Sequence, residues 1–558
     1  MHRLAAPIIH LFLWIHAFGL FQDVAAEGLR DQVREILRNR IEAAGTPPNV
    51  NVGGDIIHAA TALPRFYEAR VYQPAWIDND GPQRHAEDLI AAIHEADREG
   101  LRQNDYHLML IEKILREVHQ NQEQQKSLNP RRLVDLDLLL TDAFMIYGSH
   151  LLSGRINPET IDPEWLANRR ESDFSRILQT AFDTNSIGET LKSLLPSQMG
   201  YARLREALAH YRQIAAKGGW PAVPGGLKMQ IGACGERVRA LCLRLITTGD
   251  LDGQDTVNDD FDDILERALR KFQERHGLDV DGIVGPDTLE ALNVPVEQRI
   301  RQLELNLERW RWLPQTLGKR YVLVNMANFE LKVVEQDQPV MAMRVVVGKG
   351  YRRTPVFSGK MTYLVFNPFW RVPPGIAIQD KLPLMRKEPD YLGEQHMRVF
   401  QGWGAETKEI DPKSIDWSKA SAENFRYRLR QDPGPWNPLG RVKFMFPNRF
   451  NVYIHDTPSR ELFDKTVRMF SSGCIRIEKP IELAEYVLRD DLNWQRENIL
   501  DAIDREVEQT VQFREPIWVH LLYWTAWVNE DGITHFVRDI YGRDKRLEKA
   551  FREKPPVP

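Results

Sequence analysis

The chain has 558 residues, of which 42% are hydrophobic and 27% charged, and its formal net charge is -5. This length exceeds what one hydrophobic core usually organises, so we expect about three folded units. A nearly balanced charge excludes the basic footprint typical of nucleic-acid-binding proteins. The composition is that of an ordinary globular protein with several domains and no nucleic-acid partner.

The first residues have the three-part pattern of a secretory signal peptide. A short basic start at Arg3 precedes an apolar run over residues 5–21, and Val24 and Ala26 are the small residues before a cut after Ala26. We predict that residues 1–26 are removed on export to the periplasm, which leaves no stable membrane span. The alternative is an uncleaved membrane anchor, for which this apolar run is near the lower length limit.

Residues 27–217 are predicted to form a helical scaffold domain. Apolar residues from Leu136 to Phe144 recur at the spacing of one helix face. This region contains no chemical motif, so we assign it a structural role.

A segment rich in Gly and Pro, residues 218–226, marks a linker to a compact unit over residues 228–294. Gly282, Gly285, Thr288 and Leu292 follow the pattern G-x-x-G-x-x-T-x-x-x-L, which resembles the small three-helix peptidoglycan-binding domain of wall hydrolases. The resemblance predicts a fold more directly than it predicts glycan binding.

The chain has three cysteines, Cys234, Cys242 and Cys474. An odd number in an exported protein leaves at least one thiol without a partner in the same chain. Cys234 and Cys242 are close enough in sequence to pair if Cys234 lies in a loop before a helix, and the sequence leaves that question open. Cys474 has no nearby partner. A free thiol in an oxidising compartment is open to oxidation, which favours a functional role for this residue.

From residue 320 the pattern changes to strands. Residues 321–326 and 329–334 indicate a hairpin, and residues 341–348 and 361–368 indicate further strands. A long polar insert over residues 373–439 interrupts this pattern and contains three tryptophans, Trp403, Trp417 and Trp436. Loops of this length are usually lids or binding elements, and the alternative is a disordered decoration.

Alternation along two later segments places four reactive side chains together in pairs. In the first, Val452 and Ile454 take one strand face, so Tyr453 and His455 share the other. In the second, which runs from Cys474 to Ile477, Ile475 and Ile477 are buried while Cys474 projects beside Arg476, after Gly473 has allowed a tight turn.

These residue types suit acyl transfer by a thiolate. An imidazole can take the thiol proton, backbone N–H groups at the turn can stabilise an oxyanion, and Arg476 can hold a substrate carboxylate. A zinc site is disfavoured because no second Cys or His lies at ligand spacing, and neither a metal nor a cofactor is expected.

At these residues the sequence resembles the YkuD-type L,D-transpeptidase domain, which carries a His, a spacer and then S/T-x-G-C-x-R, here Ser471 to Arg476. Ser472 replaces the histidine that most members carry before the glycine, as in large multi-domain Gram-negative members. The resemblance implies that Cys474 is the nucleophile and His455 the base, oriented by the backbone carbonyl at Asp456. It also implies that Tyr453, Ser472, Gly473, Arg476 and Asp456 line the site.

The predicted architecture is multi-domain α+β, with a mainly-β L,D-transpeptidase catalytic domain over residues 320–500 and a C-terminal extension over residues 501–558. The resemblance implies 3→3 cross-linking of peptidoglycan stem peptides with release of D-alanine. Other cell-wall synthesis enzymes are further candidate partners. The same acyl-enzyme could serve an L,D-carboxypeptidase, D-amino-acid exchange or lipoprotein attachment, and a non-catalytic wall-binding scaffold is the rival from another class.

Overall fold

The computed structural model describes residues 28–45, 50–166, 169–253, 259–402 and 404–553. The predicted signal peptide and Trp403 lie outside these residues. The chain divides into two compact units, Met1–Glu87 with Met109–Asp142, and Asp88–Leu108 with Ala143–Pro558. Among the described helices, none has the length and hydropathy needed to cross a membrane.

The first unit is built mainly from helices, as predicted. Its core includes the carboxylate of Asp137, which accepts hydrogen bonds from the Tyr67 hydroxyl (2.5 Å) and from the backbone N–H groups of Ala75 (3.1 Å) and Trp76 (2.8 Å). These three hydrogen bonds satisfy the buried carboxylate and connect the helix that contains Asp137 to Tyr67, Ala75 and Trp76. Its elements are α1 (Leu29–Glu42), β1 (Asn51–Val52), β2 (Asp55–Ile56), α2 (Ala62–Ala69), the start of α3 (Arg84–His94), most of α4 (Leu108–Glu123) and the first half of α5 (Pro130–Ser153).

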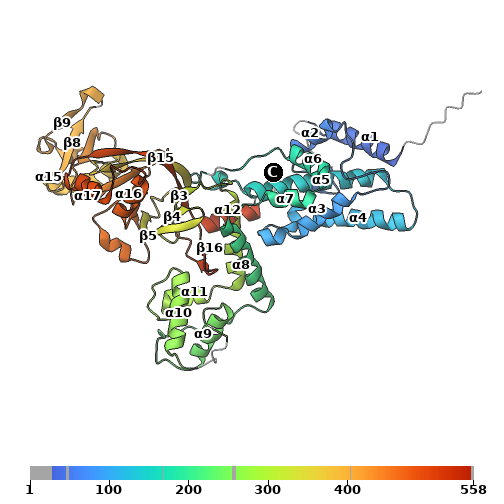
Figure 1. Ribbon diagram of the computed structural model, residues 1–558, viewed down its shortest axis with the longest axis horizontal. Helices are drawn as coiled ribbons and strands as arrows, with labels where there is room; N and C mark the ends of the chain where they lie inside the picture. The colour runs from blue at the N-terminus through green and yellow to red at the C-terminus, as the bar shows by residue number, and fades with distance from the viewer. Residues whose placement is uncertain (1–27, 46–49, 167–168, 254–258, 403, 554–558) are drawn as a thin grey trace, which may run out of the picture. The chain divides into compact units, whose positions relative to one another are not determined.

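The second unit begins with further helices and a small three-helix domain (Figure 1). Asp262 caps α10 by accepting from the N–H groups of Ile264 (3.0 Å) and Leu265 (2.9 Å), and Pro286 opens α11. The three-helix prediction is confirmed. The helices are α6 (Phe174–Asp183), α7 (Ile187–Ser193), α8 (Met199–Ala216), α9 (Glu236–Thr247), α10 (Asp263–Arg275), α11 (Pro286–Leu292) and α12 (Val296–Arg311).

The cysteines of the small domain have different environments. Cys242 is buried in α9, whereas Cys234 lies before that helix as an exposed free thiol. Cys234 therefore does not form the disulfide that the sequence left open.

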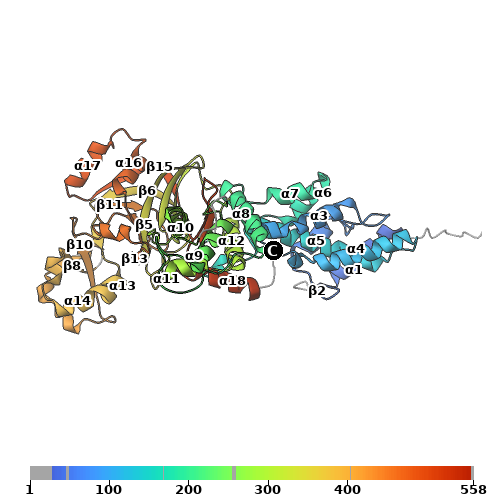
Figure 2. The ribbon, with the colours of Figure 1, turned by 90° about the horizontal axis from the view of Figure 1, so that it is seen from below.

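The region predicted to be catalytic contains a nine-stranded sheet in the order β13-β5-β14-β12-β11-β6-β15-β3-β4. Because β5 also pairs with β4, the series closes on itself around an apolar core. Helix α16 (Pro480–Leu488) packs against β15 and β11, and α17 (Arg496–Asp504) packs against α16 (Figure 2). The strands are β3 (Arg320–Asn325), β4 (Glu330–Glu335), β5 (Gln338–Gly348), β6 (Phe357–Phe366), β11 (Val442–Met445), β12 (Ile454–His455), β13 (Met469–Ser471), β14 (Ile475–Ile477) and β15 (Gln509–Leu522).

The boundary expected at residue 500 divides this sheet. Strand β15 runs antiparallel to β6 and parallel to β3, so residues 509–522 form part of the barrel rather than an extension. Strand β15 was not predicted because it follows two helices and carries no recognisable motif. After it come β16 (Ala526–Val528), β17 (Thr534–Phe536) and α18 (Arg543–Glu553).

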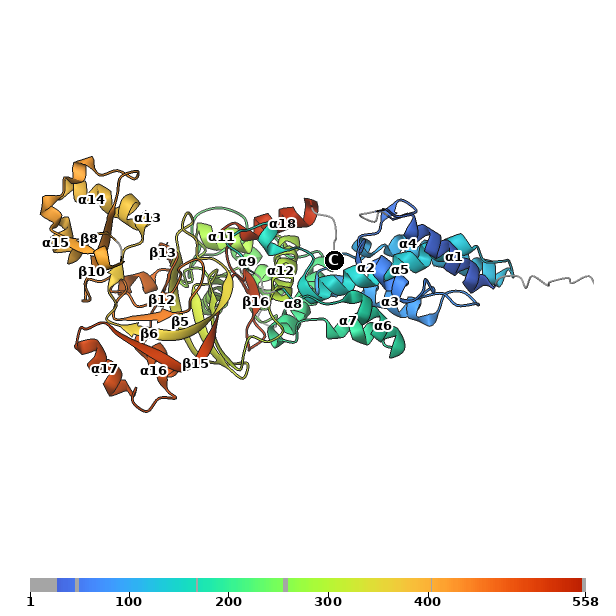
Figure 3. The same ribbon diagram turned by 90° about the horizontal axis from the view of Figure 1, so that it is seen from above.

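The insert is a folded subdomain with its own core, not a disordered decoration (Figure 3). Trp417 is buried in that core, whereas Trp436 is 40% exposed. Strand β7, which precedes residue 373, joins the insert's four-stranded sheet in the order β7-β10-β8-β9. The elements are β7 (Trp370–Arg371), α13 (Pro374–Ile376), η4 (Ala377–Lys381), α14 (Leu382–Lys387), α15 (Tyr391–Glu394), β8 (Met397–Gln401), β9 (Lys408–Ile410) and β10 (Tyr427–Gln431).

Candidate active site

Two short parallel strands bring the predicted histidine and cysteine segments together. Strand β12 pairs with β14, so that Ile454 faces Ile475 and His455 faces Arg476. The N–H of Ile475 donates to the carbonyl oxygen of Tyr453 at 3.1 Å, which extends the pairing one residue back. Tyr453 and Cys474 are therefore neighbours across the strands, as are His455 and Arg476.

The alternation predicted for both segments is confirmed. Ile454 and Ile475 are fully buried in the barrel core. Tyr453, His455, Cys474 and Arg476 instead line one cavity of about 810 Å³. The core residues of the two strands thus fix the reactive groups on the cavity side.

The Cys474 thiol shares its cavity with Tyr453. The hydroxyl and the backbone of Tyr453 both act to lower the pKa of that thiol. Burial raises the pKa of Cys474 above its usual value, while Tyr453, Lys443 and Arg476 oppose that rise. The resting thiol is consequently neutral at pH 7 and needs a base to become a nucleophile.

His455 has the orientation that a base requires. Its Nδ1 donates to the backbone carbonyl oxygen of Asp456 at 2.5 Å, leaving Nε2 for proton transfer. Burial, with smaller contributions from Arg476 and Lys443, lowers the pKa of His455 to about 3, so the ring is neutral. Among the described residues no hydrogen bond joins this ring to the Cys474 sulfur, and catalytic contacts often tighten only when substrate binds.

Lys443 is a site residue that the sequence reasoning missed. It lies on β11 in register with His455, and its Nζ is 3.9 Å from the centre of the Tyr453 ring. Burial lowers the pKa of Lys443, whereas the charge of a Cys474 thiolate would raise it. The sequence does indicate this position, because Lys443 is a charged residue between the apolar residues Val442 and Phe444. Strand alternation then places Lys443 on the same face as the reactive groups.

The turn before Cys474 is fixed by two hydroxyl groups. Ser471 Oγ accepts from the N–H of Gly473 at 3.1 Å and donates to the Cys474 carbonyl at 2.5 Å. Thr354 Oγ1 accepts from the N–H of Gly348 at 2.9 Å and donates to the Gly473 carbonyl at 2.9 Å. Gly473 has a φ of +116°, which a residue with a side chain rarely adopts.

Ser472 connects the turn to the insert. Its Oγ accepts from Nη1 of Arg352 at 3.1 Å. The same guanidinium forms a two-pronged ion pair with Asp380 of η4 (2.5 and 3.0 Å) and donates to Gln379 at 2.7 Å. Arg352 therefore bridges the catalytic turn and the insert, and it too was missed from the sequence.

Two of the predicted lining residues do not line the cavity. Gly473 is buried beneath it, and its role is to shape the turn. Asp456 contributes only its backbone carbonyl, because its carboxylate accepts from the N–H of Arg441 at 2.8 Å and pairs with Arg460. Arg476 does line the cavity, and its Nε is buried without a hydrogen-bond partner among the described residues.

The insert supplies much of the cavity wall. Its contributions include Gln379, Asp380, Lys381 and Trp436. Trp436 stacks on His396 with ring centres 3.7 Å apart. The described residues contain no group of three or more His, Cys, Asp or Glu side chains that could hold a metal ion.

Three family models match this chain. Residues 61–208 match a scaffold domain, residues 234–292 the "Putative peptidoglycan binding domain" and residues 319–502 the YkuD L,D-transpeptidase catalytic domain. The barrel that carries the cysteine and histidine strands therefore matches the model of the YkuD L,D-transpeptidase catalytic domain. The multi-domain architecture predicted from the sequence is confirmed.

A relative with a curated description supports this assignment. A Haemophilus influenzae protein named "Putative L,D-transpeptidase" is 33% identical over 301 residues, which are 52% of this chain and 59% of that protein. The match thus spans a little over half of the relative's length.

Solved L,D-transpeptidase structures also align with this chain. One from Xylanimonas cellulosilytica is 16% identical, with 54% of this chain and 99% of the other covered and a TM-score of 0.17. One from Stackebrandtia nassauensis is 13% identical, with 54% and 96% covered and a TM-score of 0.22. TM-scores this low do not define a shared fold, so the assignment of the catalytic domain rests on the family models.

Proposed function

We propose that this protein is a periplasmic L,D-transpeptidase that forms 3→3 cross-links in peptidoglycan through a cysteine acyl-enzyme. The observation that supports it best is the placement of Cys474, Tyr453 and His455 on adjacent parallel strands, in one cavity of a matching catalytic domain. The signal-peptide pattern and the peptidoglycan-binding domain agree with action on the cell wall.

The first half-reaction would be acylation by a tetrapeptide stem. The Cys474 sulfur attacks the carbonyl carbon that joins diaminopimelate to D-alanine, and its proton passes to Nε2 of His455. When the C–N bond breaks, His455 returns that proton to the leaving D-alanine nitrogen. The enzyme then holds the stem as a thioester.

The second half-reaction would resolve the thioester. The side-chain amine of another stem attacks the carbonyl carbon, His455 takes a proton from that amine, and the thiolate leaves and is reprotonated. Arg476 would bind a stem carboxylate, since its buried Nε lacks a partner. The positive charges of Lys443 and Arg476 would stabilise the departing thiolate.

The acceptor distinguishes this reaction from its alternatives. Water in place of the amine gives an L,D-carboxypeptidase, a free D-amino acid gives exchange, and an amine on a lipoprotein gives attachment. A decayed site would leave only a wall-binding scaffold. The stem peptides of peptidoglycan are the proposed substrate in each catalytic case, with other cell-wall enzymes as candidate partners.

Muropeptide analysis tests the proposal. The purified protein is incubated with tetrapeptide-rich peptidoglycan, and the digest is analysed by mass spectrometry. We expect tripeptide–tetrapeptide dimers from the wild type and from Cys234→Ser, and none from Cys474→Ala or His455→Gln. Tripeptide monomers alone would identify a carboxypeptidase, and identical digests from the wild type and Cys474→Ala would refute catalysis.

A further inference from the structure

The loop between β5 and β6, residues 349–356, holds the turn that precedes Cys474. Besides the two side-chain contacts of this loop described above, the N–H of Lys349 donates to the Ser471 carbonyl at 3.0 Å. Each of the three residues before the cysteine is thus bonded to the loop. The position of the thiol therefore depends on what fixes the loop.

The C-terminal segment fixes the loop through Tyr541, a buried residue. Its hydroxyl donates to the carbonyl of Gly348, at the end of β5, at 2.6 Å and accepts from the N–H of Thr354 at 3.5 Å. One hydroxyl group thus joins the start of the loop to the residue whose side chain bonds to Gly473. The Tyr541 ring stacks on Tyr523 with ring centres 5.7 Å apart, which limits how far the hydroxyl can move.

Arg543 links the same loop to the scaffold domain. This guanidinium is only 2% exposed, and its Nη2 donates to the Thr354 carbonyl at 3.2 Å while its Nε pairs with Asp162 at 3.0 Å. Asp162 is also buried, and it belongs to residues 61–208, which match the scaffold domain. Leaving either charge of a buried pair without its partner is costly, so the pair gives Thr354 a rigid support.

The scaffold loop, residues 162–166, also contacts the β5–β6 loop directly. Backbone hydrogen bonds of 2.8 Å join Val356 to Glu164 and to Leu166. The Glu164 carboxylate also pairs with Arg353 at 2.9 Å. Two segments outside the matched catalytic domain therefore hold the loop that supports the turn before the cysteine.

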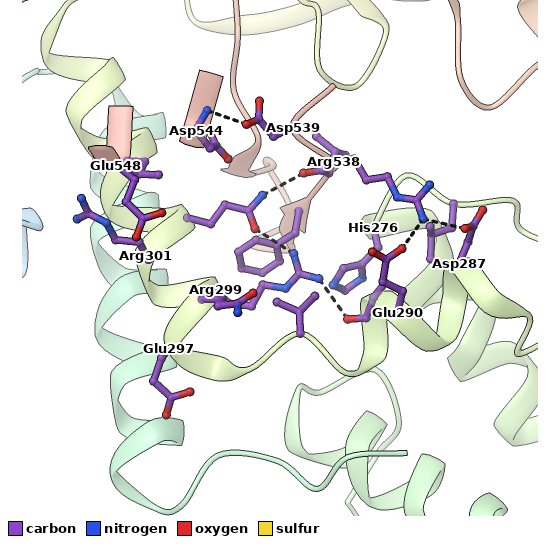
Figure 4. A pocket seen from close by; sticks show the side chains of 18 of the residues that line it. His276, Asp287, Glu290, Glu297, Arg299, Arg301, Arg538, Asp539, Asp544 and Glu548 are labelled. Carbon is purple, nitrogen blue, oxygen red and sulfur yellow. Dashed lines mark hydrogen bonds and ion pairs between the residues drawn. The ribbon is translucent and has the colours of Figure 1, made fainter. Parts of the chain in front are cut away.

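The C-terminal segment is itself anchored by Asp539. The Asp539 carboxylate accepts from the N–H of Asp544 at 2.9 Å, near the start of α18 (Figure 4). It also accepts from the Tyr523 hydroxyl at 2.6 Å and from the N–H of Arg543 at 2.7 Å. Tyr541 and Arg543 consequently lie on a support that is fixed at the end of β15 and at the start of α18.

We propose that the C-terminal segment, residues 541–543, and the scaffold loop, residues 162–166, are positioning elements for Cys474. They act through the β5–β6 loop, whose contacts set the turn that carries the thiol. Their role in turnover rests on the proposed function, whereas their effect on the thiol does not. The matched catalytic domain is then not self-sufficient in this chain, because its cysteine turn is supported by segments that precede and follow it in the sequence.

Tyr541→Phe tests this inference, because it removes one hydroxyl and keeps the stacked ring. This variant and the control Tyr363→Phe on β6, outside the cavity, are alkylated with iodoacetamide at pH 8 in the full chain with Cys234→Ser. Burial is the main cause of the raised pKa of Cys474, so a loosened turn should expose the thiol and speed its alkylation about threefold or more. Mass spectrometry locates the label, and the buried Cys242 should stay unlabelled.

Turnover of a stem peptide gives a second measurement. Tyr541→Phe should lower kcat about threefold to tenfold and leave KM nearly unchanged, because the thiol is displaced while the substrate contacts remain. Glu164→Gln, which weakens the ion pair with Arg353, should change alkylation and kcat in the same directions. The exposed Glu159→Gln should change neither.

The inference is overturned if Cys474 in Tyr541→Phe reacts at the rate of the control. Equal acceleration at Cys474 and Cys242 would also overturn it, because that result indicates a general loss of stability rather than a displaced turn. If Tyr541→Phe fails to fold, the partly exposed Glu164→Gln provides the same comparison. A wild type that turns over no peptidoglycan, with faster alkylation of Cys474 in the variant, would reject the proposed function and keep the positioning role.

Discussion

Lys443 and His455 face one another across β11 and β12, and the lysine ammonium lies over the ring of Tyr453. This relationship places a positive charge beside a neutral base and a neutral thiol. The charge lowers the pKa of both His455 and Cys474, which makes the imidazole harder to protonate and the thiolate easier to form.

Lys443→Met should raise the pKa of Cys474 and slow its reaction. At pH 8 we expect alkylation of Cys474 by iodoacetamide to fall roughly threefold to tenfold, because a smaller fraction of the thiol would be ionised. The measurement uses a Cys234→Ser background, because that exposed thiol would also react. The exposed Lys360→Met on β6 is the control, and equal rates for both variants would contradict a role for Lys443.

The low pKa of His455, about 3, predicts the acid side of the pH profile. A base works only when unprotonated, so a lowered pKa keeps it active at pH values where an ordinary histidine would be protonated. We expect kcat/KM on a stem peptide to stay nearly constant from pH 7 to pH 5. A loss with a midpoint near 6.5 would show that His455 titrates normally.

Gly473→Ala should impair catalysis because its φ of +116° disfavours any side chain. An added Cβ meets no atom closer than 3.7 Å, so the cost is conformational rather than a collision. We expect kcat to drop by about tenfold or more, since Cys474 would shift with the turn. Gly359→Ala on β6, whose added Cβ has ordinary contacts at 3.5 Å or more, should be nearly silent.

Thr354→Val removes the hydroxyl that links Gly348 to Gly473. The N–H of Gly348 would lose its partner inside the protein, at a cost of about 1–3 kcal/mol in the free energy of unfolding. Urea unfolding and kcat should both be affected. Thr510→Val, at an exposed position of β15, serves as the matched control, and equal stability of the two variants would refute this account.

Arg352→Met should loosen the contact between the insert and the catalytic turn. The variant loses the ion pair with Asp380 and the hydrogen bond to Ser472, while the core of the insert is unchanged. We expect KM for the stem peptide to rise about threefold to tenfold, with a smaller change in kcat. Arg398→Met, which breaks an exposed pair with Asp432 in the insert, should leave KM unaltered.

The reactive residues could be predicted because strand alternation is local. Val452 and Ile454 fix one face, so Tyr453 and His455 had to share the other. The position of Lys443 beside His455 could not be predicted from the sequence. It depends on the pairing of β11 with β12, and strand pairing is determined by the whole sheet. The same reason explains why β15 was missed, whereas the small domain, with its local turn and cap signals, was found.

The position of β15 has a consequence for synthesis. Strands β6 and β3 are made early, yet the strand that lies between them is encoded after both the histidine and the cysteine. A nascent chain that ends before Gln509 therefore carries every reactive side chain but has two open strand edges. The barrel can close only after residues 509–522 have been made, so the order of translation places closure after the synthesis of both the histidine and the cysteine.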